Sequence, residues 1–223
     1  MKILCVSDTT RSLAFSSSIK ELYGDVDLIV SAGDMPLSSY DYLTTNLNRD
    51  LFYVYGNHNL EEFSRTMDPD RGEMFRPEPI DPRFYGNLLD GKCIRHKDTG
   101  LLLAGLGGSY AYNGGQSQYT EWSMAWRIAK LLPHLLWNRL RYGRYLDVLV
   151  THAPPFGIGD GEDLCHRGFR SFLRFIRLFH PAVLVHGHIH LFDENLPRES
   201  FLNDTKIVNV YGCYVVVVEM EDK

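Results

Sequence analysis

Five short apolar segments recur along the chain, and each of them stops at a glycine or at a polar cluster. They are rich in Val, Ile, Leu and Tyr, and they are four to six residues long. Segments with this composition and these endings are typical of buried β-strands. The predicted strands are residues 2–6, 27–32, 51–55, 147–150 and 182–185.

Segments of helical character separate these strands. In the last of them the apolar side chains recur at spacings of three and four, and arginines form a second stripe that we interpret as a solvated helix face. Pro181 follows as a stop signal. Alternation of strands and helices predicts parallel strand pairing and an α/β architecture. The predicted helices are residues 12–23, 38–48, 120–143 and 166–179.

Two further pairs of apolar runs are spaced like β-hairpins, residues 92–97 with 101–106 and residues 206–211 with 214–220. Residues 61–90 and the glycine-rich residues 107–115 have no regular pattern. Long irregular segments of this kind are either functional lids or simply mobile, and the pattern leaves both readings open. We find no internal repeat and no linker, so we expect a single domain over residues 1–223.

Composition and charge narrow the class of protein. The chain has 223 residues, of which 44% are hydrophobic, which is enough for one large core. No run approaches the roughly 18 apolar residues of a membrane-spanning helix, and the formal charge of −5 gives no general attraction for nucleic acid. We therefore expect a cytoplasmic protein without a membrane or nucleic-acid partner. The four cysteines are far apart and are interpreted as structural.

Polar side chains follow the predicted strands at the point where each strand ends. Because the carboxyl ends of parallel strands meet at one edge of a sheet, we expect these side chains to converge. Carboxylate, amide and imidazole donors without a thiolate suit Mn, Fe, Co or Zn, and a carboxylate can bridge two cations. The residues concerned are Asp8, Asp34, Asn57, His58, His152, His188 and His190.

The order of these residues resembles the calcineurin-like metallophosphoesterase superfamily. That family has five blocks: Asp-x-His, Gly-Asp, Gly-Asn-His-Asp/Glu, a lone His, and Gly-His-x-His. The stretch from His152 to Gly157 also looks like a subgroup of small single-domain members. The corresponding blocks here are Asp8-Thr-Thr10, Gly33-Asp34, Gly56-Asn-His-Asn59, Thr151-His152 and Gly187-His-Ile-His190.

The resemblance implies a fold, two metal sites and a proton donor. It implies a four-layer α-β-β-α sandwich with two central mixed β-sheets flanked by helices. It further implies that Asp34 bridges two divalent ions, of which Mn is the first expectation and Fe, Ni, Co and Zn are alternatives. Asp8 and His190 would complete the first site, Asn57, His152 and His188 would complete the second, and His58 would act as general acid.

Two positions depart from the family pattern. Thr10 stands where the first block has histidine, which leaves the first metal with Asp8, Asp34 and His190. Asn59 replaces an acidic residue and could change the orientation or basicity of His58. These changes favour, as the alternative to an enzyme, a scaffold or binding module that kept the fold while its chemistry weakened.

The substrate is predicted less sharply than the metal site. The resemblance favours a small phosphodiester over a monoester, and Asn59, Asp160 and His166 are expected to border it. Helix capping explains Asp160 and His166 nearly as well. We expect His186 to have a packing or supporting role, and the remaining histidines, His96, His134 and His180, to be surface residues.

Overall fold

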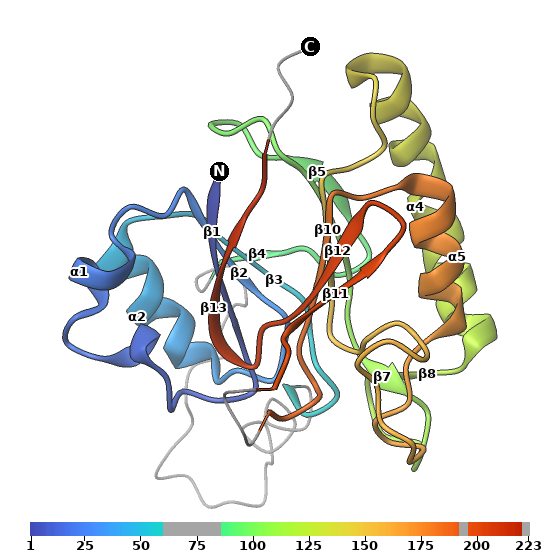
Figure 1. Ribbon diagram of the computed structural model, residues 1–223, viewed down its shortest axis with the longest axis horizontal. Coiled ribbons are helices and arrows are strands. Elements are labelled where there is room, and N and C mark those ends of the chain that lie inside the picture. Colours follow the sequence, from blue (N-terminus) through green and yellow to red (C-terminus); the bar gives the residue numbers. More distant parts are fainter. Residues whose placement is uncertain (60–85, 192–195, 220–223) are drawn as a thin grey trace, which may run out of the picture.

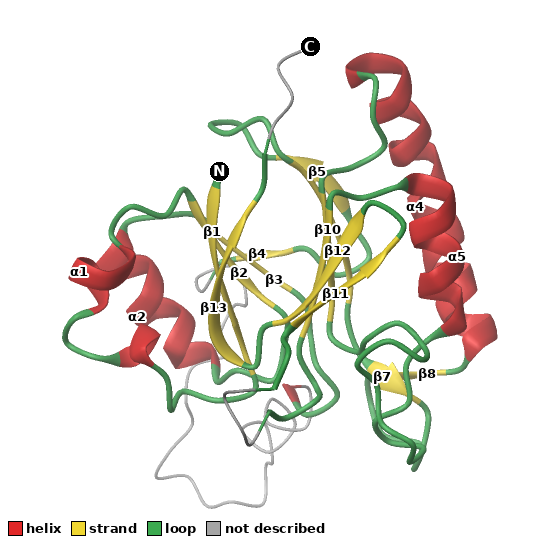
Figure 2. Cartoon of the chain, viewed as in Figure 1, coloured by secondary structure: helices red, strands yellow, loops and turns green. Residues whose placement is uncertain are grey.

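Two β-sheets lie face to face between two pairs of helices. This is the arrangement of the computed structural model, which describes residues 1–59, 86–191 and 196–219. Figure 1 shows α1 and α2 outside one sheet and α4 and α5 outside the other. The predicted α-β-β-α layering is confirmed, and Figure 2 shows the layers by type of structure.

The first sheet has the order β13-β1-β2-β3-β4. Neighbouring strands from β1 to β4 run parallel, and β13 pairs with β1 antiparallel. Its strands are β1 (Lys2–Ser7), β2 (Leu28–Ser31), β3 (Leu51–Tyr53), β4 (Asn87–Leu88) and β13 (Gly212–Val217).

The second sheet has the order β11-β12-β10-β9-β6-β5, with antiparallel pairs at its two edges. The four central strands run parallel. Its strands are β5 (Cys93–Arg95), β6 (Leu102–Leu106), β9 (Val148–Thr151), β10 (Val183–His186), β11 (Glu199–Leu202) and β12 (Thr205–Asn209). A small separate sheet pairs β7 (Ser109–Tyr110) with β8 (Gln118–Tyr119).

The main core lies between the two sheets and is built from alternate side chains of the central strands. Ile3 and Cys5 of β1 point into it, whereas Leu4 packs on the helix side of the same sheet. The strands are therefore covered on both faces, which explains why they read as continuous apolar runs.

The helices are shorter than the sequence predicts at two places. The expected helix 12–23 is broken into a short 3-10 turn, Leu13–Phe15, and α1 (Ile19–Tyr23). Residues 166–169 lie outside α5 (Arg170–Phe179), because Phe169 has extended backbone angles. The other two helices match closely: they are α2 (Leu37–Leu47) and α4 (Glu121–Tyr142).

One predicted hairpin is confirmed and the other is wrong. Strands β5 and β6 pair antiparallel, as expected for residues 92–97 and 101–106. Residues 206–211 and 214–220 do not pair: β12 joins β10 and β11, whereas β13 crosses to the other sheet and pairs with β1. The chain changes sheets at Gly212, whose φ of 75° is readily adopted by glycine.

The structure also bears on the predictions for His96 and for the irregular segment 61–90. His96 is 5% exposed, not a surface residue, because its ring packs edge-on against Phe52 and its nitrogens contact Thr99 and Asp50. Of the irregular segment 61–90, residues 61–85 lie outside the described residues, and residues 87–88 form β4.

Candidate metal centre

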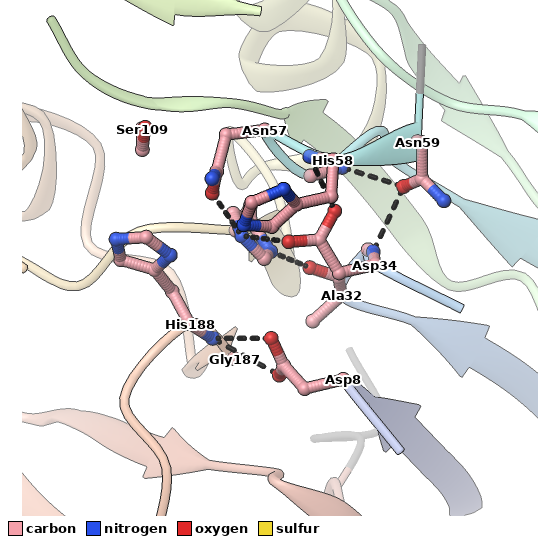
Figure 3. A network of polar contacts seen from close by, with 12 residues as sticks. Asp8, Ala32, Asp34, Asn57, His58, Asn59, Ser109, Gly187 and His188 are labelled. Carbon is pink, nitrogen blue, oxygen red and sulfur yellow. Dashed lines mark hydrogen bonds and ion pairs between the residues drawn. The ribbon is translucent and has the colours of Figure 1, made fainter. Parts of the chain in front are cut away.

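Both sheets deliver polar side chains to the same end of the molecule. In the first sheet Asp8 follows β1, Asp34 follows β2, and Asn57 and His58 follow β3. The second sheet contributes the histidines that follow β9 and β10, namely His152, His188 and His190. Figure 3 shows side chains from the two sheets directed toward one another. The convergence expected from the strand ends is therefore present.

The backbone at three of these positions has the left-handed conformation that non-glycine residues rarely adopt. The φ angles are 64° at Asp8, 53° at Asp34 and 67° at His188. Such residues cost on the order of 1–3 kcal/mol each and persist where the surroundings fix them. Strained backbone at three polar residues that face one another is typical of a functional site.

Two glycines allow the chain to pass close to the carboxylates. A Cβ at Gly56 would collide with the carboxylate of Asp34, and a Cβ at Gly187 would collide with that of Asp8. Glycine is required at both places for this steric reason. The glycines of the third and fifth sequence blocks thus form part of the cradle around the acids.

Asp8 lies at the floor of the site, with its side chain only 2% exposed. The backbone N–H of His188 donates to both carboxylate oxygens, at 3.2 and 3.0 Å. Burial raises the pKa of Asp8, and this effect exceeds the lowering caused by the nearby charge of His152. The contact joins the ends of β1 and β10, and therefore the two sheets.

His152 is fully buried and its ring orientation is fixed by the backbone. Its Nδ1–H donates to the carbonyl of Ala32 at 2.7 Å. Nε2 then faces Asn57 Oδ1 at 3.0 Å and Asp34 Oδ2 at 3.2 Å. A histidine held through one nitrogen, with the other turned to oxygen ligands, has the arrangement found at metal sites.

Asp34 and His152 form a buried ion pair. Burial opposes the charge on each group, but their mutual attraction prevails: the pKa of His152 is raised to about 9 and that of Asp34 is lowered to about 2. The proton on Nε2 therefore occupies the position between imidazole and oxygen ligands that a cation would take.

His188 completes this side of the site. Its Nε2–H donates a hydrogen bond to the carbonyl of Cys165 at 2.8 Å. The lone pair of Nδ1 is therefore the one that could bind a metal. Its ring lies 4.8 Å from that of His152. Burial and the charge of His152 lower the pKa of His188 to about 3, so it is neutral and ready to act as a ligand.

The half of the site around Asp8 and His190 is more open. His190 is 47% exposed, its Nε2 lies 3.9 Å from Asp8 Oδ1, and its ring stacks on Tyr211 at 4.8 Å. Thr10 is exposed just beyond β1. The side chains on this half are thus farther apart and less buried than those around His152.

Asn59 is buried and clamps the neighbouring turn. Its Oδ1 accepts hydrogen bonds from the N–H groups of Asp34 and Gly56, both at 2.8 Å, and its Nδ2 donates to Met35 O at 3.0 Å. His58 is exposed, and its backbone N–H donates to Asp34 Oδ1 at 2.9 Å. Asn59 therefore supports the Asp34 turn, a role that the sequence analysis did not foresee.

Asp160 and His166 lie in the loop between β9 and α5. Asp160 accepts from the N–H groups of Gly157 and Gly168, at 2.9 and 3.0 Å, and so closes the loop. His166 pairs with Asp163 at 2.8 Å, and its ring lies 5.3 Å from that of His188. The same loop lines a cavity of about 520 Å³.

The donor set fits a divalent metal. Asp8, Asp34 and His152 each offer a ligand atom, and these atoms lie within 4.8 Å of one another. Asn57 and His188 contact or flank the same group, and His190 lies at its edge. The backbone carbonyls of Ala32 and Cys165 orient His152 and His188. A backbone carbonyl has no side-chain signal, so the sequence could not reveal this role.

The chain is similar to a known protein family and to several solved structures. A family described as calcineurin-like phosphoesterase matches residues 1–192, a range that includes every candidate ligand. No curated protein matches the chain. Among solved structures, TT1561 of Thermus thermophilus is similar, with 16% identity, a TM-score of 0.59, and coverage of 95% of this chain and 89% of that chain.

Two other solved structures show weaker similarity to this chain. GAP50, the anchor in the inner membrane complex of Plasmodium, has 13% identity and a TM-score of 0.50, with coverage of 94% and 70%. A 5'-nucleotidase from Candida albicans SC5314 has 12% identity and a TM-score of 0.47, with coverage of 93% and 44%. At these identities the likeness concerns the fold.

Proposed function

Because the chain belongs to the calcineurin-like phosphoesterase family, we propose that it hydrolyses a small phosphoester, a phosphodiester in preference to a monoester. The observation that carries this proposal is the cluster of Asp8, Asp34 and His152, whose ligand atoms lie within 4.8 Å of one another. A scaffold has no need of three strained or buried ligand residues directed at one point.

We assign two divalent cations to this cluster, with Mn as the first candidate. Asp34 would be shared, Asp8 and His190 would hold one ion, and Asn57, His152 and His188 would hold the other. When bound, such cations lower the pKa of water and neutralise charge on phosphoryl oxygens. The ring contacts of His152 with Ala32 and of His188 with Cys165 support this division, since each leaves one ring nitrogen available.

We propose that His58 delivers the proton to the departing oxygen. Its side chain is exposed at the site, while its backbone is held by Asp34. An imidazole placed in this way can donate a proton to the departing alkoxide. We keep His166 as a candidate substrate contact because its ring adjoins that of His188. Asn59 and Asp160 would act by supporting their loops.

A scaffold role is the second candidate, and Thr10 is the observation that favours it. It replaces the histidine of the first block and is exposed beyond β1. One similar structure, GAP50, is named as an anchor. The experiment below separates the two functions, because a scaffold with an intact fold would not turn over phosphoesters.

Metal-free protein should regain hydrolysis of a chromogenic phosphodiester when Mn, Ni or Co is added, and chelator should abolish it. Fe, Zn and Mg complete the series, and a chromogenic monoester should be a poorer substrate. The reason is the mixed oxygen and nitrogen donor set. Metal content, measured on the same samples, makes a negative result informative: bound metal without turnover with any of these metals would favour the scaffold function over the enzyme.

Replacing His58 by alanine should slow turnover by roughly 10²–10⁴-fold, the usual effect of losing a positioned proton donor. The loss should shrink for esters with good leaving groups, which need no protonation. His134→Ala is the matched control, since His134 is an exposed histidine of α4. If metal content falls with activity in the His58 variant, His58 is a ligand and the assigned role is wrong.

A further inference from the structure

Helix α4 is apolar on two opposite faces. Met124, Leu131 and Leu135 are buried against the second sheet, as expected of an outer helix. The face turned to solvent also carries large apolar side chains, which are 57 to 81% exposed. We call this set the outer face of α4: Trp122, Trp126, Leu136, Trp137 and Leu140.

The composition of this face is unusual for a helix exposed to water. The chain has three tryptophans, and all three lie here. Trp122 and Trp126 are one turn apart and contact each other edge to face, with ring centroids 6.1 Å apart. A contiguous exposed apolar patch of this kind marks a surface that binds a membrane or another molecule.

The charged side chains of α4 and of its neighbour α5 are almost all basic. The two helices pack against each other and together carry seven Lys and Arg residues and one acidic residue, although the whole chain has a formal charge of −5. One of the seven, Arg127, is already paired with Asp90. The single acidic residue is Glu121, at the start of α4. Its carboxylate accepts hydrogen bonds from the backbone N–H groups of Arg170 and Ser171, at 2.7 and 3.1 Å. Lys130 and Arg174 are among the exposed basic side chains.

We propose that the outer face of α4 binds the surface of an anionic lipid bilayer. Tryptophan and leucine on one side of a helix, flanked by Lys and Arg, are the combination that holds an amphipathic helix in the headgroup region. The positive charges complement anionic headgroups and are drawn to them over a Debye length. Figure 1 shows α4 beside α5 at the outer edge of the molecule, on the side of the second sheet that faces away from the first.

This inference differs from the expectation that the protein has no membrane partner. That expectation rested on the absence of a long apolar run, and none of the described helices is in fact long and apolar enough to cross a membrane. A helix that lies in the interface needs no such run. Its signal is the helical spacing of Trp122, Trp126 and Trp137, which becomes visible only once the buried face of α4 is known.

The test uses the full chain with vesicles of phosphatidylcholine alone and of phosphatidylcholine with phosphatidylglycerol. The protein should sediment with the anionic vesicles and much less with the neutral ones, and binding should weaken as salt is raised. Since every tryptophan is on α4, a blue shift of intrinsic emission on binding reports this face directly.

Two variants separate the apolar and the electrostatic contributions. Trp122→Ser combined with Trp126→Ser should weaken partitioning by about ten-fold or more, and Lys130→Glu combined with Arg174→Glu should do the same for anionic vesicles. The matched control removes two exposed apolar side chains elsewhere, Leu13→Ser with Phe201→Ser, and should change partitioning less than about two-fold. Thermal unfolding verifies that all variants are folded.

Three outcomes would overturn the proposal. Folded wild-type protein that does not bind anionic vesicles is one, and binding that the tryptophan variant leaves unchanged is another. The third is concentration-dependent self-association that the tryptophan variant abolishes in the absence of vesicle binding, which would make a second copy of the chain the occupant of this face. None of these measurements depends on phosphoesterase activity.

Discussion

Asn59 occupies the position where the family motif carries an acidic residue, and its amide does what a carboxylate cannot. The side-chain oxygen accepts from two N–H groups while the side-chain nitrogen donates to Met35 O. A carboxylate could keep the two accepted bonds but would place a second oxygen against the carbonyl of Met35. The departure from the family pattern is therefore matched to the turn that holds Asp34.

Asn59→Asp should destabilise the protein by about 1–3 kcal/mol at pH 8, because a buried carboxylate would face an acceptor without a donor. The pKa of the introduced carboxyl would be raised above its unfolded value, so the missing stability is regained as the pH falls and the protonated group donates to Met35 O. Thermal unfolding at pH 5 and pH 8 measures this.

Asn203→Asp is the control, since Asn203 is exposed in a turn with a φ of 54° that aspartate tolerates. It should unfold like the wild type at both pH values. A position-59 variant whose loss of stability relative to the wild type is the same at pH 5 and pH 8 would contradict the role given to the amide.

Among the elements, the strands that end at the site were the most predictable. Each is buried on both faces, so its apolar run is uninterrupted, and each ends at a polar residue because the chain turns there toward the ligand cluster. These two features are local, and they located Asp8, Asp34 and His152 correctly in the fold. What the pattern could not specify is the left-handed backbone at Asp8 and Asp34, which depends on neighbours from other strands.

Strand partners far apart in the sequence were harder to predict. β12 and β13 are apolar runs separated by two residues, with Gly212 at the start of β13, and this is also the pattern of a hairpin. Nothing within the two runs indicates that β13 pairs with β1, at the opposite end of the chain, and that β12 pairs with β11. The choice depends on the edge that each sheet leaves open, which is a property of the assembled fold.

Across the whole molecule, the site joins the two sheets. Asp8, Asp34 and Asn57 come from the first sheet, and the candidate ligands His152, His188 and His190 come from the second. One of the links between the sheets is the ion pair of Asp34 with His152, and the attraction of Asp34 raises the pKa of His152 to about 9. A cation bound by these residues would replace that proton and connect the sheets more strongly.

Metal should therefore stabilise the fold as a whole. At a free concentration 100 times the dissociation constant, a ligand that binds only the native state adds about 2.7 kcal/mol to the free energy of unfolding. The midpoint of thermal unfolding should rise with Mn and fall on chelation. The apparent affinity should weaken by up to about ten-fold for each pH unit below 9, because the cation must displace the proton of His152.

The stabilisation should come in two unequal steps. The proposed site of Asn57, His152 and His188 is buried, whereas the other proposed site has only Asp8 and the half-exposed His190 besides Asp34, which we propose is shared. Thr10→His would add an imidazole ligand to the weaker site, so it should tighten the second binding event and raise activity at limiting metal. Thr45→His, at an exposed position of α2, should leave both steps unchanged.

Calorimetric titration of the wild type and the two variants with metal measures the two affinities separately. Two equally tight sites in the wild type, unaffected by Thr10→His, would mean that another residue supplies the missing ligand and that the first sequence block is wrongly matched to the family.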